Sequence, residues 1–323
     1  MSQDAATPSR TSDFTSAERT LGVVVGFDGS NYSKLALHYG ARSAQRRGSA
    51  LTVVTSFTIA PGVYATLAAV PRIPDEQLKY QATKPTLDLA RELLEDYPGE
   101  VTYLAEEGDA AGILVEKSQD AQLVVVGGRG LGGFLGLLLG SVASALPAYA
   151  KSPTVIIPGN YDDGEGTARF APVESSGPVV VGIDGSAHSR TAVLQAARAA
   201  SERGVTLQIL MVLPPLDGAL LWYPELTNQV DEVTQQRRAE LQETVDAERD
   251  WLKDHFPDLE VSTTVEPGDP VSVLRKKSRT AQLIVVGTRG LGGLRSTMLG
   301  SVSRGLLLRG EGPVMVVPQP EEA

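Results

Sequence analysis

The stretch VVVGFDGS at residues 23–30 recurs almost unchanged as VVVGIDGS at residues 179–186. In each copy the run of valines is typical of a strand buried on both faces, and the Asp-Gly-Ser after it is typical of a turn into a helix. A second stretch also occurs twice, as LVVVGGRGLGG at residues 123–133 and LIVVGTRGLGG at residues 283–293. In both cases the two copies lie about one domain length apart in the chain. The repeated unit is therefore a whole domain, and the chain is a tandem duplication.

The repeats divide the 323 residues into two domains, in agreement with a usual domain size of about 150 residues. The start of the chain is rich in Ser, Thr, Asp and Ala and has no apolar segment of the kind a signal peptide contains. We expect a disordered leader at residues 1–19, a first domain at 20–158, a polar linker at 159–176 and a second domain at 177–319.

Each copy alternates short apolar runs with amphipathic stretches. Such alternation predicts an α/β fold with right-handed crossovers, a parallel sheet and helices on both faces, so two tandem doubly wound domains are expected. Ligands of such sheets lie beyond the carboxyl ends of the strands. In the first copy the predicted strands are residues 21–27, 50–57, 100–105, 123–127 and 154–158, and the predicted helices are residues 30–47, 76–97, 110–119 and 141–150.

Composition excludes several classes of function. A net charge of −10 disfavours nucleic acid and anionic membranes as partners. With no cysteine and three widely spaced histidines, thiol catalysis and a His-rich metal site are not expected, and a reducing, cytoplasmic location fits. The charge-free stretch at residues 130–150 is long enough to span a bilayer, but its counterpart contains three arginines, so neither copy is predicted to be a membrane segment.

Glycines after the fourth predicted strand form the most specific motif, G-x2-G-x9-G-S, in both copies. A phosphate chain needs backbone without Cβ atoms, N–H groups that point inward and a helix N-terminus, and such a loop can provide all three. The alternative is that these glycines only make tight turns. The motif comprises Gly127, Gly130, Gly140 and Ser141 in the first copy and Gly287, Gly290, Gly300 and Ser301 in the second.

Two better-known phosphate motifs do not fit. The chain has no G-x4-G-K-[ST], which excludes a P-loop. The pattern G-x-G-x-x-G occurs in the first copy, but Thr288 and Arg295 break it in the second, and no acidic residue follows at the distance that a dinucleotide site requires.

Aspartates follow the first strand of each copy, at Asp28 and Asp184. Each can be a helix cap or turn former, or it can contact a ribose, a base or a phosphate-bound metal, and the sequence leaves both open. Asp109 and Asp269 also precede helices and are predicted to be caps.

Together, the VGxDGS start, the EEGD and EPGD segments at residues 106–109 and 266–269, the glycine motif and the final apolar strand resemble the universal stress protein family. The resemblance is to the tandem-domain form of its ATP-binding branch. It implies in each domain a five-stranded parallel sheet in the order 3-2-1-4-5, with ATP, alone or with Mg2+, over the carboxyl edge. It also implies that the last strands, at residues 154–158 and 314–318, pair antiparallel within the chain, and it leaves a homodimer open.

Site residues follow from the same resemblance. Asp28 and Asp184 would lie near the adenosine, Ser56 and Val212 occupy the positions that hold the base, and Arg295 is the basic residue of the nine-residue spacer, where the first copy has Leu135. The phosphates would meet Gly127, Gly130, Gly140, Ser141 and Val142 in the first copy and Gly287, Gly290, Gly300, Ser301 and Val302 in the second.

No catalytic machinery is apparent in the sequence, because it has no Ser-His-Asp order, no paired carboxylates beside the glycine loop and no lysine within it. The predicted function is therefore an ATP-binding regulatory protein of the stress response, with at most slow hydrolysis. The alternatives are an ATP-using enzyme of the nucleotidyl-transferase type and a structural interaction module without nucleotide.

Overall fold

A computed structural model of the chain describes residues 18–58, 75–131, 139–161, 170, 177–186, 189–215, 227–290 and 299–319. Most of the predicted leader, and the spacer positions Leu135 and Arg295, lie outside the described residues. The chain divides into two compact units, residues 1–173 and 174–323, and each is described by itself.

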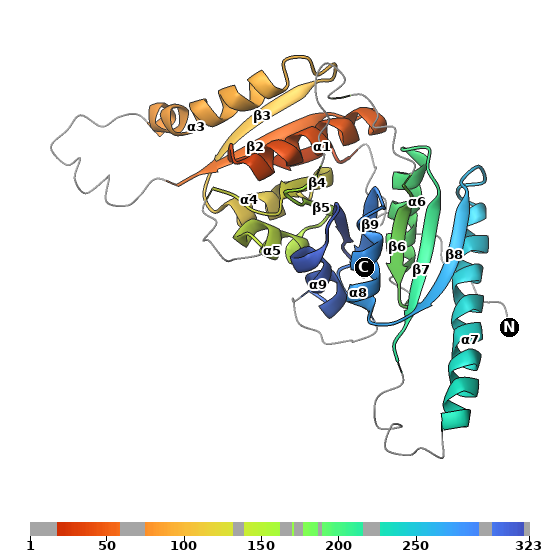
Figure 1. The fold of residues 1–323 in the computed structure, drawn as a ribbon. Helices are drawn as coiled ribbons and strands as arrows, with labels where there is room; N and C mark the ends of the chain where they lie inside the picture. Colours follow the sequence, from red (N-terminus) through yellow and green to blue (C-terminus); the bar gives the residue numbers. More distant parts are fainter. Residues whose placement is uncertain are drawn as a thin grey trace. The chain divides into compact units, whose positions relative to one another are not determined.

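Unit 1 is a parallel sheet with the strand order β3-β2-β1-β4-β5, as predicted (Figure 1). The crossovers place α1 beside α3 and α4 beside α5. Its elements are β1 (Gly22–Gly26), α1 (Asn31–Arg47), β2 (Leu51–Phe57), α3 (Asp75–Leu93), β3 (Val101–Glu107), α4 (Ala110–Lys117), β4 (Ala121–Gly127), α5 (Ser141–Tyr149) and β5 (Thr154–Ile157).

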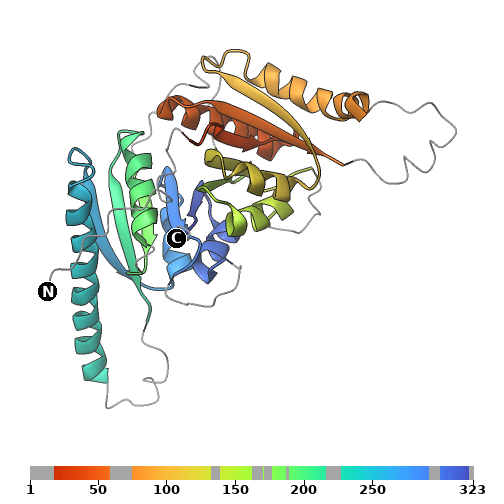
Figure 2. The ribbon, with the colours of Figure 1, turned by 180° about the vertical axis from the view of Figure 1, so that it is seen from behind.

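Unit 2 repeats this arrangement in the order β8-β7-β6-β9-β10, again with parallel pairs (Figure 2). Its elements are β6 (Val179–Ile183), α6 (Ser189–Ser201), β7 (Leu207–Leu213), α7 (Thr227–Lys253), β8 (Val261–Pro267), α8 (Pro270–Lys277), β9 (Leu283–Gly287), α9 (Ser301–Arg309) and β10 (Val314–Val317).

The first strand shows why both faces of the sheet are covered. A Cβ at Gly40 of α1 would lie 2.3 Å from Val25, whereas a Cβ at Gly26 would lie 2.8 Å from Leu114 of α4. Since side chains alternate between the faces of a strand, the odd-numbered valines pack on α1 and position 26 faces α4. Burial on both sides explains why the strand is valine-rich throughout.

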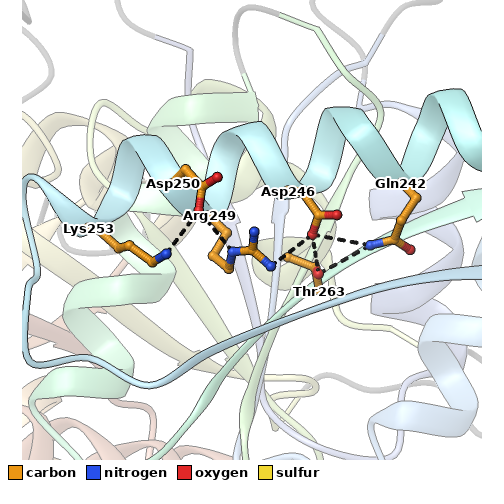
Figure 3. A network of polar contacts seen from close by, with 6 residues as sticks. All are labelled: Gln242, Asp246, Arg249, Asp250, Lys253 and Thr263. Carbon is orange, nitrogen blue, oxygen red and sulfur yellow. Dashed lines mark hydrogen bonds and ion pairs between the residues drawn. The ribbon is translucent and has the colours of Figure 1, made fainter.

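Polar side chains attach the long helix α7 to the edge strand β8 (Figure 3). Asp246 Oδ1 accepts hydrogen bonds from Thr263 Oγ1 at 2.7 Å and from Arg249 Nη1 at 3.0 Å. Gln242 Nε2 donates to Thr263 Oγ1 at 3.2 Å. This network supplements the apolar contact of Val245 and Leu252, which are fully buried on the same helix.

The predicted element boundaries differ most from the structure at the end of α3. The predicted helix at residues 76–97 ends at Leu93, and residues 94–96 form turns. The predicted linker contains Tyr161, which packs edge-on against Tyr39 at 5.6 Å, and Phe170, which stacks on His38 at 5.7 Å. Both aromatic residues pack on α1 of unit 1, and isolated aromatic residues in a polar segment show no periodicity that would predict such packing.

Candidate functional site

The predicted site lies at the carboxyl edge of each sheet, where the central strand and its neighbour end. In unit 1 these strands are β1, followed by Asp28, and β4, which ends at Gly127. In unit 2 they are β6, followed by Asp184, and β9, which ends at Gly287. The topology therefore brings the repeated Asp-Gly-Ser turn and the glycine loop to adjacent strands.

Asp28 forms the turn after β1 and also contacts the glycine loop. Its Oδ1 accepts a hydrogen bond from the Ser30 backbone N at 3.0 Å, and its Oδ2 accepts one from the Leu131 backbone N at 2.9 Å. Burial raises the pKa of Asp28, but hydrogen bonds from Ser30 and Leu131 outweigh burial and hold the pKa below the ordinary aspartate value. Asp28 is therefore an anion that connects two loops, whereas the N-cap of α1 is Ser30.

Asp184 has a similar position in unit 2. Its Oδ1 accepts hydrogen bonds from the Ser186 backbone N at 3.1 Å and from Ser189 Oγ at 2.9 Å. The glycine between aspartate and serine has φ of +81° in both units, at Gly29 and Gly185, so a residue with a Cβ would be strained there.

The glycine loops pack against these turns. A Cβ at Gly130 would lie 2.5 Å from Asp28 Oδ2, and a Cβ at Gly290 would overlap the carboxylate of Asp184. At Gly127 a Cβ would lie 2.6 Å from the backbone carbon of Tyr32. These positions therefore require glycine for packing within the protein, a reason distinct from the expected close approach of phosphates.

The helices that follow the glycine loops begin without a side-chain cap. Gly140 is the N-cap of α5 and Gly300 the N-cap of α9, and neither provides a capping hydrogen bond to the first turn. In contrast, Ser30, Asp109 and Asp269 cap α1, α4 and α8 with side-chain oxygens, as predicted for both aspartates. The first N–H groups of α5 and α9 have no intrahelical acceptor, so both termini retain a partial positive charge suited to an anion.

The glycine N-caps are themselves held in place. The Gly140 N–H donates to the Gly128 carbonyl at 2.8 Å, and the Gly300 N–H donates to the Thr288 carbonyl at 2.8 Å. Each of these hydrogen bonds joins residues on either side of the nine-residue spacer. The residues after the caps remain accessible, since Ser141 and Ser301 are exposed and Val142 and Val302 are half-buried.

The candidate base positions lie on the other side of the central strand. Ser56 is near the carboxyl end of β2 and Val212 near that of β7, and both are half-buried. In register, Ser56 lies opposite Glu106 and Val212 opposite Glu266. The central strand thus separates the candidate base positions from the glycine loop.

An ion pair that the sequence did not predict recurs in both units. Lys117 Nζ of α4 lies 3.0 Å from Glu106 Oε1, and Lys277 Nζ of α8 lies 2.5 Å from Glu266 Oε1. The hydrogen bond with Glu106 raises the pKa of Lys117. A lysine at the end of the same helix in both copies was the available signal.

Clusters of metal ligands and membrane-spanning helices are both absent from the part of the chain that the structure describes. Among the described residues, no cluster of three or more His, Asp or Glu side chains is arranged to hold a metal ion. Within the same part of the chain, no helix has the length and hydropathy needed to cross a bilayer.

Comparison with known proteins identifies the family. Residues 22–158 and 176–318 each match the universal stress protein family. A universal stress protein of Mycobacterium tuberculosis is 35% identical over 335 residues, covering 95% of this chain and 98% of that protein. One of Mycolicibacterium smegmatis is 33% identical over 307 residues, covering 92% and 96%.

Solved structures agree on the fold. The crystal structure of a universal stress protein from Archaeoglobus fulgidus superposes with a TM-score of 0.60 at 20% identity, covering 93% of this chain and 98% of that one. The chain belongs to the universal stress protein family and contains two family domains in tandem.

Proposed function

We propose that the protein is an ATP-binding regulatory protein of the stress response, with one nucleotide site in each unit. The observation that carries this proposal is the pair of uncapped helix N-termini at Gly140 and Gly300, both behind a G-x2-G-x9-G-S loop. The other helices with described N-caps are capped by side chains, so the two exceptions coincide with the two predicted phosphate sites.

In this proposal the phosphates bind to backbone N–H groups of the first turn. Ser141 and Val142 provide them in unit 1, and Ser301 and Val302 in unit 2, with the serine hydroxyls as further donors. Gly127, Gly130 and Gly290 give the loops their shape, because they admit the Tyr32 backbone and the two aspartates. Gly287 lies against the Arg289 carbonyl of its own loop, which a Cβ would approach to 3.1 Å.

Asp28 and Asp184 would position the loops beside the adenosine. Both Asp28 oxygens accept backbone hydrogen bonds, so we expect Mg2+, where present, to be held by phosphate oxygens and water. Ser56 and Val212 would contact the base through backbone atoms, and Arg295 would approach the phosphates of the second site. The role is regulatory, and we expect at most slow hydrolysis.

Calorimetric titration of the full chain with ATP tests the proposal. We expect binding to both units and a rise in melting temperature of about 5–10 °C at an ATP concentration of about 100 times the dissociation constant. The double variant Gly140→Val/Gly300→Val should lose both effects, since a side chain at Gly140 would meet the Arg129 Cα at 3.2 Å and displace the loop.

Gly112→Val is the matched control. It makes the same change in the first turn of α4, where the nearest atom to a new Cβ is Asp109 Oδ2 at 3.5 Å. This variant should bind ATP as the parent does. If ATP produced neither heat in the titration nor a rise in melting temperature of the parent protein, the proposal would be refuted.

A further inference from the structure

Unit 2 has a basic surface on its α8–α9 pair, although the chain as a whole is acidic. Arg275, Lys276 and Arg279 are exposed along α8 and just after it, and Arg309 is exposed in the last turn of α9. The helices pack closely, because a Cβ at Gly305 of α9 would lie 2.6 Å from Val271 of α8. We call these four cations the basic face.

A carboxylate is already bound at one end of the basic face. Glu311 Oε1 accepts hydrogen bonds from Arg275 Nε at 3.1 Å and Nη2 at 2.9 Å, and Glu311 Oε2 accepts one from Arg279 Nε at 2.9 Å. The arginine side chains stay 46% and 58% exposed, and a guanidinium has five N–H donors. The face therefore has the donor geometry for carboxylates and retains accessible donors beyond Glu311.

The charge of Arg309 also affects Asp269, the N-cap of α8. Hydrogen bonds from Ser272 lower the pKa of Asp269, and the positive charge of Arg309 lowers it further. Arg309 is therefore close enough for its charge to affect the start of α8, and its charge adds to that of the α8 cations.

Unit 1 is an internal control for the role of these cations. At the corresponding positions of α4 and α5 it has Val115, Glu116, Gln119 and Tyr149, none of which is basic. Its helices nevertheless pack together as α8 and α9 do. The fold therefore does not require the cations, whereas the lysine paired with glutamate, Lys117 or Lys277, is present in both units.

We propose that the basic face docks a short acidic segment of a partner polypeptide. Both helices span only about 12–14 Å, enough for a few residues of extended chain. A nucleic acid or an anionic bilayer would extend its charge over the acidic remainder of the protein, which would repel it. An acidic peptide segment can confine its carboxylates to the face, within the screening length of about 8 Å.

Fluorescence anisotropy with a labelled hexaglutamate peptide tests this proposal on the full chain. We expect saturable binding at an ionic strength of about 0.05 M that weakens about tenfold or more at about 0.3 M. The double variant Lys276→Glu/Arg309→Glu should weaken binding by about tenfold or more. The control Lys79→Glu/Arg238→Glu changes the net charge equally at exposed positions on α3 and α7 and should stay within about twofold of the parent.

Three outcomes would overturn the proposal. The first is no binding of the peptide to the parent at low ionic strength. The second is equal weakening in both double variants, which would show attraction to the overall charge only. The third is tighter binding of single-stranded DNA or phosphatidylserine vesicles than of the peptide, with the same dependence on Lys276 and Arg309, which would assign the face to a different partner.

Discussion

At the residue scale, Asp28 has two structural tasks, and the sequence indicated only one of them. The turn with Ser30 follows from the Asp-Gly-Ser stretch, whereas the bond to Leu131 joins residues far apart in the chain. An anion at this place would repel a phosphate chain that came close. We therefore expect phosphates to lie toward α5, where the helix terminus is positive.

Asp28→Asn should lower the free energy of unfolding by about 1 kcal/mol near pH 7, because an amide oxygen can replace only one of the two carboxylate acceptors. The expected loss is no larger because the site is partly solvated. The folded-state pKa is depressed, so this contribution is present above the unfolded-state pKa of about 3.9 and is lost as the pH falls through the folded value. Urea denaturation at pH 7 and pH 3 should show the difference between variant and parent shrinking in acid. Asp96→Asn, at an exposed position, should show no such change.

At the element scale, the N-caps divide the helices into two groups, one capped by side chains and one, α5 and α9, that begins at an uncapped glycine. Ser30, Asp109 and Asp269 satisfy first-turn N–H groups of α1, α4 and α8, which stabilises each helix by about 1 kcal/mol. The corresponding positions of α5 and α9 are glycines with φ of −74° and −62°, a conformation that other residues readily adopt. Backbone strain therefore does not explain these glycines.

Gly300→Asp should cap α9 and at the same time place an anion in the proposed phosphate site. The reference is Gly300→Ala, which adds the same Cβ near the Thr288 carbonyl. The aspartate variant should have a free energy of unfolding about 0.5–1 kcal/mol higher than that of the alanine variant. It should also bind ATP at least about tenfold more weakly at the second site, measured in a Gly140→Val background. Unchanged affinity in the aspartate variant would argue against phosphate binding at this terminus.

At the scale of the whole molecule, duplication has produced two similar units with different charge. Residues 283–310 contain four arginines and no acidic residue, whereas residues 123–150 contain only Arg129. Phosphates respond mainly to charges within about 8 Å, so local cations outweigh the distant acidic surface. Cytoplasmic location, pairing of the last strands and a homodimer stay predictions at this scale.

The second site should therefore bind ATP about tenfold more tightly than the first, and Arg295→Leu should remove most of the difference. Titration of Gly140→Val and Gly300→Val separately isolates one site in each protein. Equal affinities at moderate ionic strength, or a tighter first site, would show that local charge does not rank the sites.

The amino-acid sequence determined the duplication, the succession of strands and helices along the chain of each unit, the caps at Asp109 and Asp269 and the place of the glycine loops. These features depend on patterns within a few residues, such as valine runs, turn glycines and a recurring motif. The order of the strands within the sheet came from the family resemblance, and the structure confirms it in each unit.

Only the tertiary structure decided what those residues contact. It showed that Gly127 and Gly130 accommodate Tyr32 and Asp28, that Tyr161 and Phe170 pack on unit 1, and that a lysine–glutamate pair recurs. Each of these contacts joins separate elements. Such contacts depend on how the helices pack on the sheet and on which strands are neighbours, and a local pattern does not contain that information.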